Sequence, residues 1–370
     1  FSKEYDFPGQ GNITYWIEIP KNSTILNATF NLTGKITTIY SKLIKSSNIA
    51  PWGISIGDVV GGSDKEIVTG TSALDGNISV LYGRNGSVIW TYLISNNFIY
   101  DTSIGDITSD PGNEIVAGSA DKHVYVLNCD DSGASEAWSY NTSSDVKAVA
   151  IGDIDEDGDN EILAGSDKLY VLNSSGNLEW EFELGGIEDL SVGNITSDSG
   201  MEIVVGNSTG VSVINSSGSL VWFKYLGTTV NSVDIGNITS DPGNEIVAGG
   251  TDDKVYLLNT SDTSGEVVWE YQAGGDIVSV SVGDVIGAET GNEIVAGSDD
   301  GKLYTLNSSG CLIWEYVTES QVKSVAIGNI TSDEGNETVC GAIDGYIYTF
   351  NFDYFPDNVS IDVDADGSYE

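Results

Sequence analysis

The sequence predicts an all-β chain made of seven similar four-stranded units, and three observations support this. Runs at 102–119, 149–166 and 232–250 are similar to one another. Each contains a glycine that ends a predicted strand, and such glycines recur at intervals of 41 to 48 residues: Gly57, Gly105, Gly152, Gly193, Gly236, Gly283 and Gly328. A tryptophan follows in step, at Trp90, Trp138, Trp180, Trp222, Trp269 and Trp314. A repeat of this length with four strands is typical of a blade, so we expect a seven-bladed β-propeller.

The third unit shows the strand pattern within a repeat. Alternating apolar and polar residues, rich in β-branched and aromatic types, predict strands at Val146–Ile151, Glu161–Ala164, Lys168–Leu172 and Leu178–Glu183. Turn residues separate these runs, and no stretch keeps a helical period. The recurring tryptophans are therefore interpreted as core packing, while Trp16 and Trp52 lie outside that register.

The seventh unit lacks a fourth strand, because no tryptophan strand follows Tyr346–Asn351. The run Lys35–Ile44 has strand character and directly precedes the first unit, so we expect it to complete the seventh blade and close the ring. This gives an N-terminal β-segment at 1–34, a propeller at 35–354 and a C-terminal strand extension at 355–370. The terminal segments are too short for cores of their own.

Charge and composition exclude several classes of function. The 370 residues include 56 Asp+Glu against 14 Lys+Arg, a formal charge of −42, which excludes a nucleic-acid binder and disfavours docking on anionic lipid. One His and three Cys leave most zinc and acid–base chemistries without residues. His123 is interpreted as a strand residue and Cys340 as a small buried thiol. No apolar run approaches the length of a membrane span, and a chain that opens on Phe1 is interpreted as processed or excerpted.

The loop between the first two strands of the third unit is the strongest metal candidate. It places carboxylates at Asp153, Asp155, Asp157, Asp159 and Glu161, with Gly158 to let the loop turn. Calcium prefers six to eight oxygen ligands, and five uncompensated carboxylates in nine residues would repel one another. The sequence therefore predicts a Ca²⁺ site here, with a solvated acidic turn as the alternative.

Four other units repeat this loop with fewer charges, so weaker calcium sites or hydrogen-bonded turns around the Glu are both open. Their candidate ligands are Asp106, Thr108, Asp110 and Glu114; Asn194, Asp198 and Glu202; Asn237, Asp241 and Glu245; and Asn329, Asp333 and Glu337. The central Thr recurs as Thr196, Thr239 and Thr331. The loops of units one (Asp58, Asp64, Glu66) and six (Asp284, Glu289, Glu293) depart further from the pattern.

Asparagine sequons are dense, because 17 of the 28 Asn residues begin an N-x-[ST] triplet. This excess predicts N-linked glycans on the protein's exterior. The candidate sites are Asn12, Asn22, Asn27, Asn31, Asn77, Asn85, Asn141, Asn173, Asn207, Asn215, Asn259, Asn307, Asn336 and Asn358. Asn194, Asn237 and Asn329 are also sequons, but they open candidate calcium loops, and a bound metal would exclude a glycan there.

These motifs carry resemblances to known families. The acidic loops resemble those of FG-GAP and VCBS-type extracellular propellers, which implies calcium at the loop carboxylates. Runs such as 168–182 resemble the blade repeat of quinoproteins, although the chain has no adjacent cysteine pair and no set of cofactor ligands. The segments at 13–34 and 358–370 resemble modules of archaeal cell-surface proteins, which implies an exported chain.

Together these observations predict an extracellular, calcium-binding, N-glycosylated structural protein, not an enzyme. We expect a subunit of a cell-surface layer, sheath or filament that forms a homo-oligomer by β-strand exchange through its terminal strands. One alternative is a carbohydrate- or protein-binding propeller module. Another is an enzyme, either a polysaccharide lyase or hydrolase or a quinoprotein, which a cluster of carboxylates or lysines at the central channel would favour.

Overall fold

A computed structural model describes the ring between residues 51 and 353, except 63, 72–75, 95–96, 110, 198, 240–242, 261–262, 287–290, 319 and 332–334. For 2–7, 10–16, 27–31, 38–45 and 360–364 it describes the backbone strands alone. Two compact units emerge, Thr38–Asp353 and a second made of Phe1–Thr37 with Tyr354–Glu370. Within the described residues, no helix has the length and apolarity needed to cross a bilayer.

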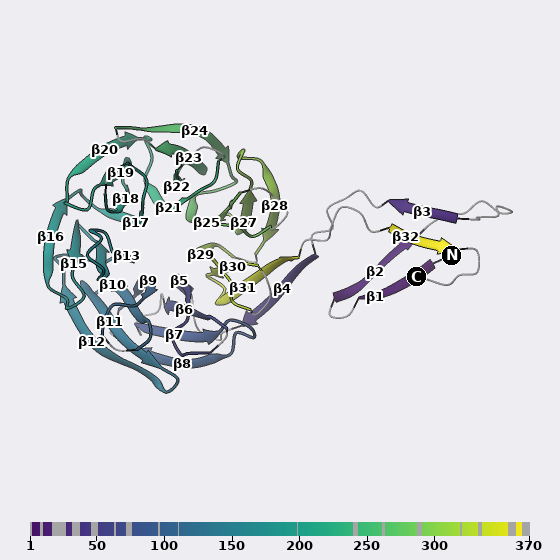
Figure 1. The fold of residues 1–370 in the computed structure, drawn as a ribbon, viewed down its shortest axis with the longest axis horizontal. Coiled ribbons are helices and arrows are strands. Elements are labelled where there is room, and N and C mark those ends of the chain that lie inside the picture. Colours follow the sequence, from purple (N-terminus) through teal and green to yellow (C-terminus); the bar gives the residue numbers. More distant parts are fainter. Residues whose placement is uncertain are drawn as a thin grey trace. The chain divides into compact units, whose positions relative to one another are not determined.

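The larger unit is a ring of seven four-stranded antiparallel sheets, which confirms the predicted propeller (Figure 1). We call the sheets blades one to seven. In blades one to six the first strand in sequence lies nearest the centre and the later strands follow outward, and blade seven keeps this order in its first three strands (Figure 1). The predicted strands of blade three agree with the observed ones within two residues.

The inner strands are β5 Pro51–Gly57, β9 Ile99–Gly105, β13 Ala148–Gly152, β17 Ile187–Gly193, β21 Val230–Gly236, β25 Ile277–Gly283 and β29 Val322–Gly328. The second strands are β6 Glu66–Thr71, β10 Glu114–Ser119, β14 Glu161–Gly165, β18 Glu202–Asn207, β22 Glu245–Gly250, β26 Glu293–Ser298 and β30 Glu337–Ala342. Every residue of these second strands is buried, because they lie between blade neighbours on both faces.

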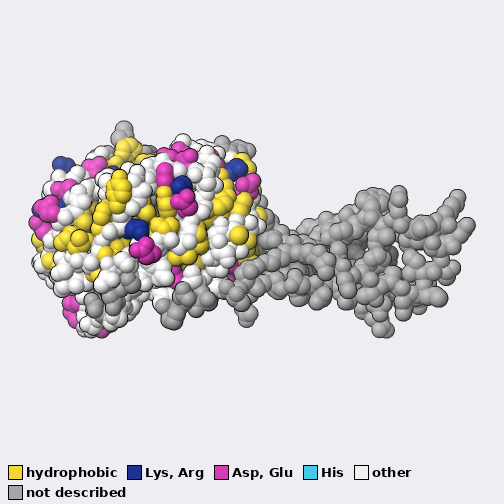
Figure 2. Space-filling model, turned by 90° about the horizontal axis from the view of Figure 1, so that it is seen from above, with side chains coloured by type: hydrophobic (Ala, Val, Ile, Leu, Met, Phe, Trp, Pro, Cys, Tyr) yellow, Lys and Arg dark blue, Asp and Glu magenta, His cyan; other side chains and the backbone are white. Residues whose placement is uncertain are grey.

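The third strands are β7 Asn77–Tyr82, β11 His123–Asp130, β15 Lys168–Leu172, β19 Gly210–Ile214, β23 Lys254–Thr260, β27 Lys302–Leu306 and β31 Tyr346–Asp353. The outer strands of blades one to six are β8 Val88–Leu93, β12 Gly133–Asn141, β16 Leu178–Glu183, β20 Leu220–Tyr225, β24 Gly265–Gln272 and β28 Leu312–Val317. Figure 2 shows this outer wall edge-on, with apolar side chains between charged ones; Leu220, Phe223 and Tyr225 of β20 are among the exposed residues.

The seventh blade takes its outer strand from the other end of the chain. Strand β4 (Thr38–Lys45) pairs antiparallel with β31 from Tyr346↔Lys45 to Asp353↔Thr38. This confirms the prediction that the run at 35–44 closes the ring. In the smaller unit, β1 (Ser2–Phe7) pairs with β2 (Gln10–Trp16), and β3 (Asn27–Asn31) pairs with β32 (Ser360–Asp364).

Side-chain oxygens tie the inner strands of successive blades together. The donor at each junction is the backbone N–H of the fourth residue of an inner strand. In blade one this residue is Ile54, counted from Pro51. Ser324 Oγ accepts from Ile54 N–H at 2.9 Å, and Ser232 and Ser279 accept from Val280 and Val325 at 3.0 Å each. At these three junctions, one hydroxyl oxygen thus accepts a backbone N–H of the next blade.

Aspartates take over where the preceding blade has no acceptor. Gly53 and Ala148 occupy the acceptor position in blades one and three, and the next blades carry Asp101 and Asp189 there. One oxygen of each Asp accepts the N–H of the following residue at 2.8 Å. The other accepts from the next blade, Val149 N–H at 2.9 Å and Val233 N–H at 2.8 Å. The equivalent N–H of all seven inner strands is thus satisfied, in five cases by an oxygen of the preceding blade and in two, Thr102 and Leu190, by the Asp of its own strand.

The outer tryptophans form a second set of contacts between blades. The indole Nε1–H of Trp90, Trp138 and Trp269 donates to a carbonyl in a turn of the next blade, at 3.0 to 3.1 Å. The interpretation of these residues as packing residues therefore agrees with their contacts. At the ring closure, Trp314 instead packs edge-on against Phe350 and Phe352 of blade seven, with ring centroids 5.0 Å apart in both pairs.

We predict that Phe350→Ala lowers the free energy of unfolding by about 3–5 kcal/mol, because it leaves a cavity at the closing junction. Phe350 is fully buried and its ring also lies 4.9 Å from that of Tyr316. The matched control is Phe223→Ala on the outer wall, which should change stability by less than about 1 kcal/mol. Equal effects of the two substitutions in chemical denaturation would contradict the packing assigned to the closing blade.

Candidate functional site

The predicted acidic loops divide into two kinds. In blades two, four, five and seven, a threonine hydroxyl donates to the glutamate that begins the second strand. The pairs are Thr108–Glu114 at 3.0 Å, Thr196–Glu202 at 2.5 Å, Thr239–Glu245 at 2.6 Å and Thr331–Glu337 at 2.8 Å. Each glutamate also accepts a backbone N–H from the loop at 2.8 to 2.9 Å. These contacts correspond to the hydrogen-bonded turn that the sequence left open.

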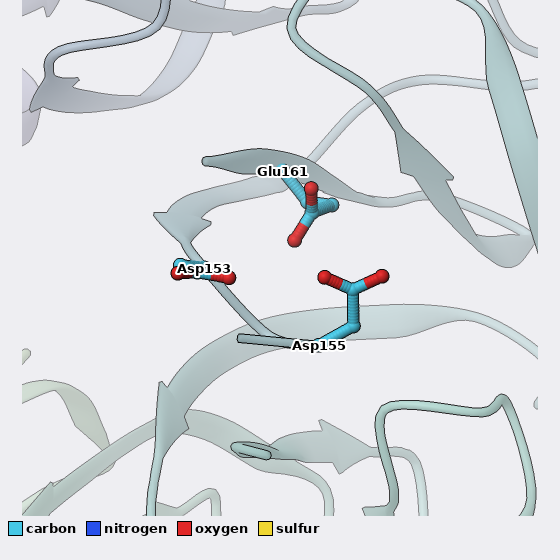
Figure 3. Close-up of side chains that lie close together, drawn as sticks. All are labelled: Asp153, Asp155 and Glu161. Carbon is cyan, nitrogen blue, oxygen red and sulfur yellow. The ribbon is translucent and has the colours of Figure 1, made fainter. Parts of the chain in front are cut away.

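Blade three differs at the threonine position, where it carries Asp155. The carboxylate oxygens of Asp153, Asp155 and Glu161 lie within 4.8 Å of one another. Figure 3 shows the three carboxyl groups facing a common space, with Asp153 and Asp155 on the loop and Glu161 at the start of β14. In blade three, a carboxylate thus stands where the other four loops have a threonine hydroxyl. Glu161 therefore lacks the hydrogen bond that this hydroxyl donates to the glutamate in those loops.

The donor set of blade three fits a calcium ion. Asp153 Oδ2 accepts Gly158 N–H at 3.0 Å, but its Oδ1 is buried and has no hydrogen-bond partner among the described residues. A buried acceptor without a donor is costly, and a cation would satisfy it. Asp157 and Asp159 lie outside the trio and are exposed, and Asp159 N–H donates to Asp157 Oδ1 at 2.9 Å.

The neighbouring carboxyl groups of this loop also oppose ionisation of Glu161. Burial raises the pKa of Glu161 to about 7, and the charges of Asp155, Glu179 and Asp157 add to the rise, against the hydrogen bond from Ile154 N–H. Burial, with Asp155 and Asp157, also raises the pKa of Glu179 on β16. The sequence interpretation missed Glu179, because its approach to the loop depends on the pairing of β15 with β16.

Several predicted ligands lie outside the described residues: Asp110, Asp198, Asp241, Asp333 and Glu289. The first residues of two of these loops contribute backbone carbonyls between blades. Asn160 Nδ2–H donates to Asp106 O at 2.7 Å, and Asn244 Nδ2–H donates to Asn194 O at 2.9 Å. Asn113 and Asn336 make the same bond to Asp58 and Asp284 at 2.8 and 3.0 Å. The loops therefore couple neighbouring blades.

The antiparallel order gives the ring two chemically different ends. Connections from first to second and third to fourth strands lie at one end, which we call the loop end because it holds the acidic loops. The remaining connections lie at the other end, which we call the mouth end. Nine ring sequons lie at the loop end: Asn85, Asn173, Asn194, Asn215, Asn237, Asn259, Asn307, Asn329 and Asn336. Three lie at the mouth end: Asn77, Asn141 and Asn207.

The side chains of some sequons are already engaged. Asn207 is 6% exposed and its Nδ2–H donates to Ser212 Oγ at 3.3 Å, while Asn336 makes the bond between blades described above. Asn173, Asn215 and Asn307 instead use Oδ1 to accept backbone N–H groups of their own turns, at 2.8 to 3.1 Å. Side chains of Asn12, Asn27 and Asn31 are not described, and Asn22 and Asn358 lie outside the described residues.

The centre of the ring contains a cavity of about 740 Å³ lined by inner-strand residues. Three half-buried carboxyl groups, those of Asp101, Asp189 and Asp234, lie on its wall, and burial raises the pKa of Asp101 and Asp234 to about 6 and that of Asp189 to about 7. Each accepts two backbone N–H groups; for Asp234 these come from Ile235 and Val282, at 2.8 Å. Their oxygens thus have a structural role in holding the ring.

Other residues that the sequence singled out have packing or rim positions. Asn141 Nδ2–H donates to His123 Nε2 at 3.1 Å, and the imidazole lies beside Tyr125. Cys340 is fully buried, as predicted, and burial raises the pKa of its thiol; burial also raises the pKa of Cys129 to about 12. Trp52 lines the cavity and stacks on Tyr100, with ring centroids 5.4 Å apart.

Comparison with known proteins identifies the blade repeat. A family described as outer membrane protein assembly factor BamB matches residues 170–363, more than half of the chain. Crystal structures of BBS1N in complex with ARL6DN, soaked with mercury or lead, superpose with TM-scores of 0.67 and 0.66. Each superposition covers 86% of this chain and 97% of the matched chain. The sequence identities are 12% and 14%, so these structures support the fold alone. No curated protein matches the chain.

We predict that Ca²⁺ raises the melting temperature of the protein and that Asp155→Thr removes this response. The substitution gives blade three the Thr–Glu pair of blade four, so the loop no longer needs a cation, whereas binding to the native state alone stabilises it by mass action. Differential scanning calorimetry in chelator and in millimolar Ca²⁺ measures both effects. The control Asp159→Asn changes a carboxylate outside the trio. A wild-type melting temperature that is the same in both buffers would contradict the site.

We predict that stability in chelator rises as the pH falls from about 7.5 to 5. The pKa values of Asp101, Asp189 and Asp234 are raised by burial, so their stabilising contribution is complete below the unfolded pKa and is lost as the pH rises through about 6–7. The slope is about 1.4 kcal/mol per pH unit for each carboxyl protonated only in the folded state. Asp189→Asn should flatten it in urea denaturation, whereas the exposed Asp131→Asn should leave it unchanged. An unchanged slope in Asp189→Asn would contradict the assignment.

Proposed function

The chain belongs to the family described as outer membrane protein assembly factor BamB, and on that basis we propose that it is a non-enzymatic propeller scaffold at the exterior of the cell. It serves as a subunit of a surface layer, sheath or filament. Calcium at blade three stabilises the ring, and N-linked glycans cover its loop end. The family description names an assembly factor, which is compatible with a role in holding other chains together.

The strand pairing of the smaller unit is the observation that carries this proposal. Among the described strands, β1 pairs with β2 alone and β3 with β32 alone. A two-stranded sheet is marginally stable in water, and its edges present unpaired N–H and C=O groups. Strands of a second copy would extend these sheets by β-augmentation and link one propeller to the next.

The channel supports a non-enzymatic role. Three of the carboxyl groups on its wall, Asp101, Asp189 and Asp234, accept backbone N–H groups that join neighbouring blades, although a cluster of carboxyl groups there would favour an enzyme. The loops of blades two, four, five and seven share one hydrogen-bonded turn, whereas the trio of carboxylates in blade three suits a metal ion. Sequons gathered at the loop end support an exported, glycosylated protein. Glycans there would leave the mouth end of the ring accessible.

A binding module is the second candidate, and the mouth end favours it. Trp52 and Tyr100 place two stacked aromatic rings on the wall of the cavity, where a ligand or a partner side chain would meet them. Aromatic surface of this kind contributes strongly to recognition.

We predict that the full chain forms concentration-dependent assemblies larger than its 39.1 kDa mass. Thr29→Pro, in the middle of β3, should reduce assembly because proline removes a ladder N–H and blocks strand addition. The control Thr29→Val keeps the backbone donor and should assemble like the wild type. Light scattering after size exclusion measures the masses, with circular dichroism to confirm that the ring is folded. A wild type that stays monomeric up to high micromolar concentration would refute assembly through these strands.

A further inference from the structure

The central cavity opens among side chains of the mouth end. Its lining includes the second residues of six inner strands, Trp52, Tyr100, Glu188, Asn231, Val278 and Lys323, together with Lys147 directly before β13. Thr251, Asp276, Asp299 and Gln321, from connections at the same end, also line it, and no described residue of the acidic loops does. Its volume of about 740 Å³ lies in the range of sites for small organic ligands.

One side of this mouth is aromatic. The rings of Trp52 and Tyr100 are 22° from parallel, and Phe98 lies 6.1 and 6.2 Å from them. The described cation–π contacts of the protein are those of Lys254 with Tyr256 and of Lys302 with Tyr304, both away from this group. The electron-rich faces of aromatic rings attract organic cations within about 6 Å.

The net charge of the cavity lining also favours a cation over an anion. Six carboxyl groups line the cavity, Asp101, Glu188, Asp189, Asp234, Asp276 and Asp299, against two ammonium groups. One of these, Lys147, is already paired with Glu188 at 2.6 Å, which leaves Lys323 as the second cation. An anionic ligand would face this excess of acid, whereas a cation would relieve it.

The pKa of Asp276 reflects this excess of carboxyl groups. Its pKa is raised by burial first and then by the charges of Asp299, Asp253 and Asp252. The phenol of Tyr100 lies 3.4 Å from Asp145 Oδ2, so another carboxylate borders the aromatic group. Aromatic surface and acidic rim therefore occur together at one opening.

We propose that the mouth end binds an organic cation, an ammonium or guanidinium group held against Trp52 and Tyr100 and balanced by Asp276 and Asp299. This deepens the second candidate function, the binding module, and does not depend on the scaffold role or on calcium. The cation is either a free amine or the side chain of a lysine or arginine in a polypeptide, since both present the same chemistry.

The test is calorimetric titration of the full chain with choline and with 3,3-dimethylbutanol, its neutral isostere. Choline should bind at least tenfold more tightly, because the two ligands share a shape and differ in charge. Trp52→Leu should weaken choline binding at least tenfold and Trp52→Phe less, because Phe keeps a ring face. Asp276→Asn should weaken it about threefold. The control Trp90→Phe lies on an outer strand and should bind like the wild type.

A parallel titration with trilysine identifies the source of the cation. Binding of trilysine more tightly than choline, with the same loss in Trp52→Leu, supports a polypeptide side chain; the reverse order supports a free amine. Equal binding of choline and its isostere, or no binding of any cation by folded protein, would overturn the proposal. Binding of neutral oligosaccharides that depends on Trp52 would also overturn it, while leaving the binding-module function in place.

Discussion

The ladder between β31 and β4 is the interaction on which the rest of the structure depends. It joins strands from opposite ends of the chain, so the ring closes by backbone hydrogen bonds and not by side-chain contacts alone. Closure places blade seven against blade one, where Ser324 accepts the N–H of Ile54, and against blade six, where Phe350 receives Trp314. Both the central cavity and the hydrogen bond from blade one to blade seven require this closure.

The residue opposite the buried glutamate is one difference between the candidate metal centre and four similar loops. A threonine there donates a hydrogen bond, so the carboxylate is satisfied within the protein. An aspartate there brings a second negative charge and no hydrogen, and Asp153 adds a buried oxygen without a donor among the described residues. The first position differs too, since Asn194, Asn237 and Asn329 replace the aspartate in three of the four loops.

Much of the fold could be predicted from the sequence, because strand alternation and the recurring glycine and tryptophan are local patterns. The closing strand was also predictable, since Lys35–Ile44 had strand character and blade seven lacked one strand. The candidate site was predicted in part. The trio in blade three is contained in one short loop, but the roles of Asp101, Asp189 and Glu179 depend on partners about one blade or one strand away. No local pattern indicates that Asp101 compensates for Gly53, because the two residues meet only when blades stack.

The alternating acceptors at the junctions have a consequence for the identity of the blades. Asp101 and Asp189 follow the two blades that lack an acceptor, whereas Ser232, Ser279 and Ser324 each supply a single oxygen to the next. Each blade is therefore matched to its neighbours, although all share one fold. Exchanging blades four and five, for example, would leave the N–H of Val233 without its acceptor and would give that of Leu190 two. The acceptors therefore constrain the order of the repeats, and blades that share one fold are not all interchangeable.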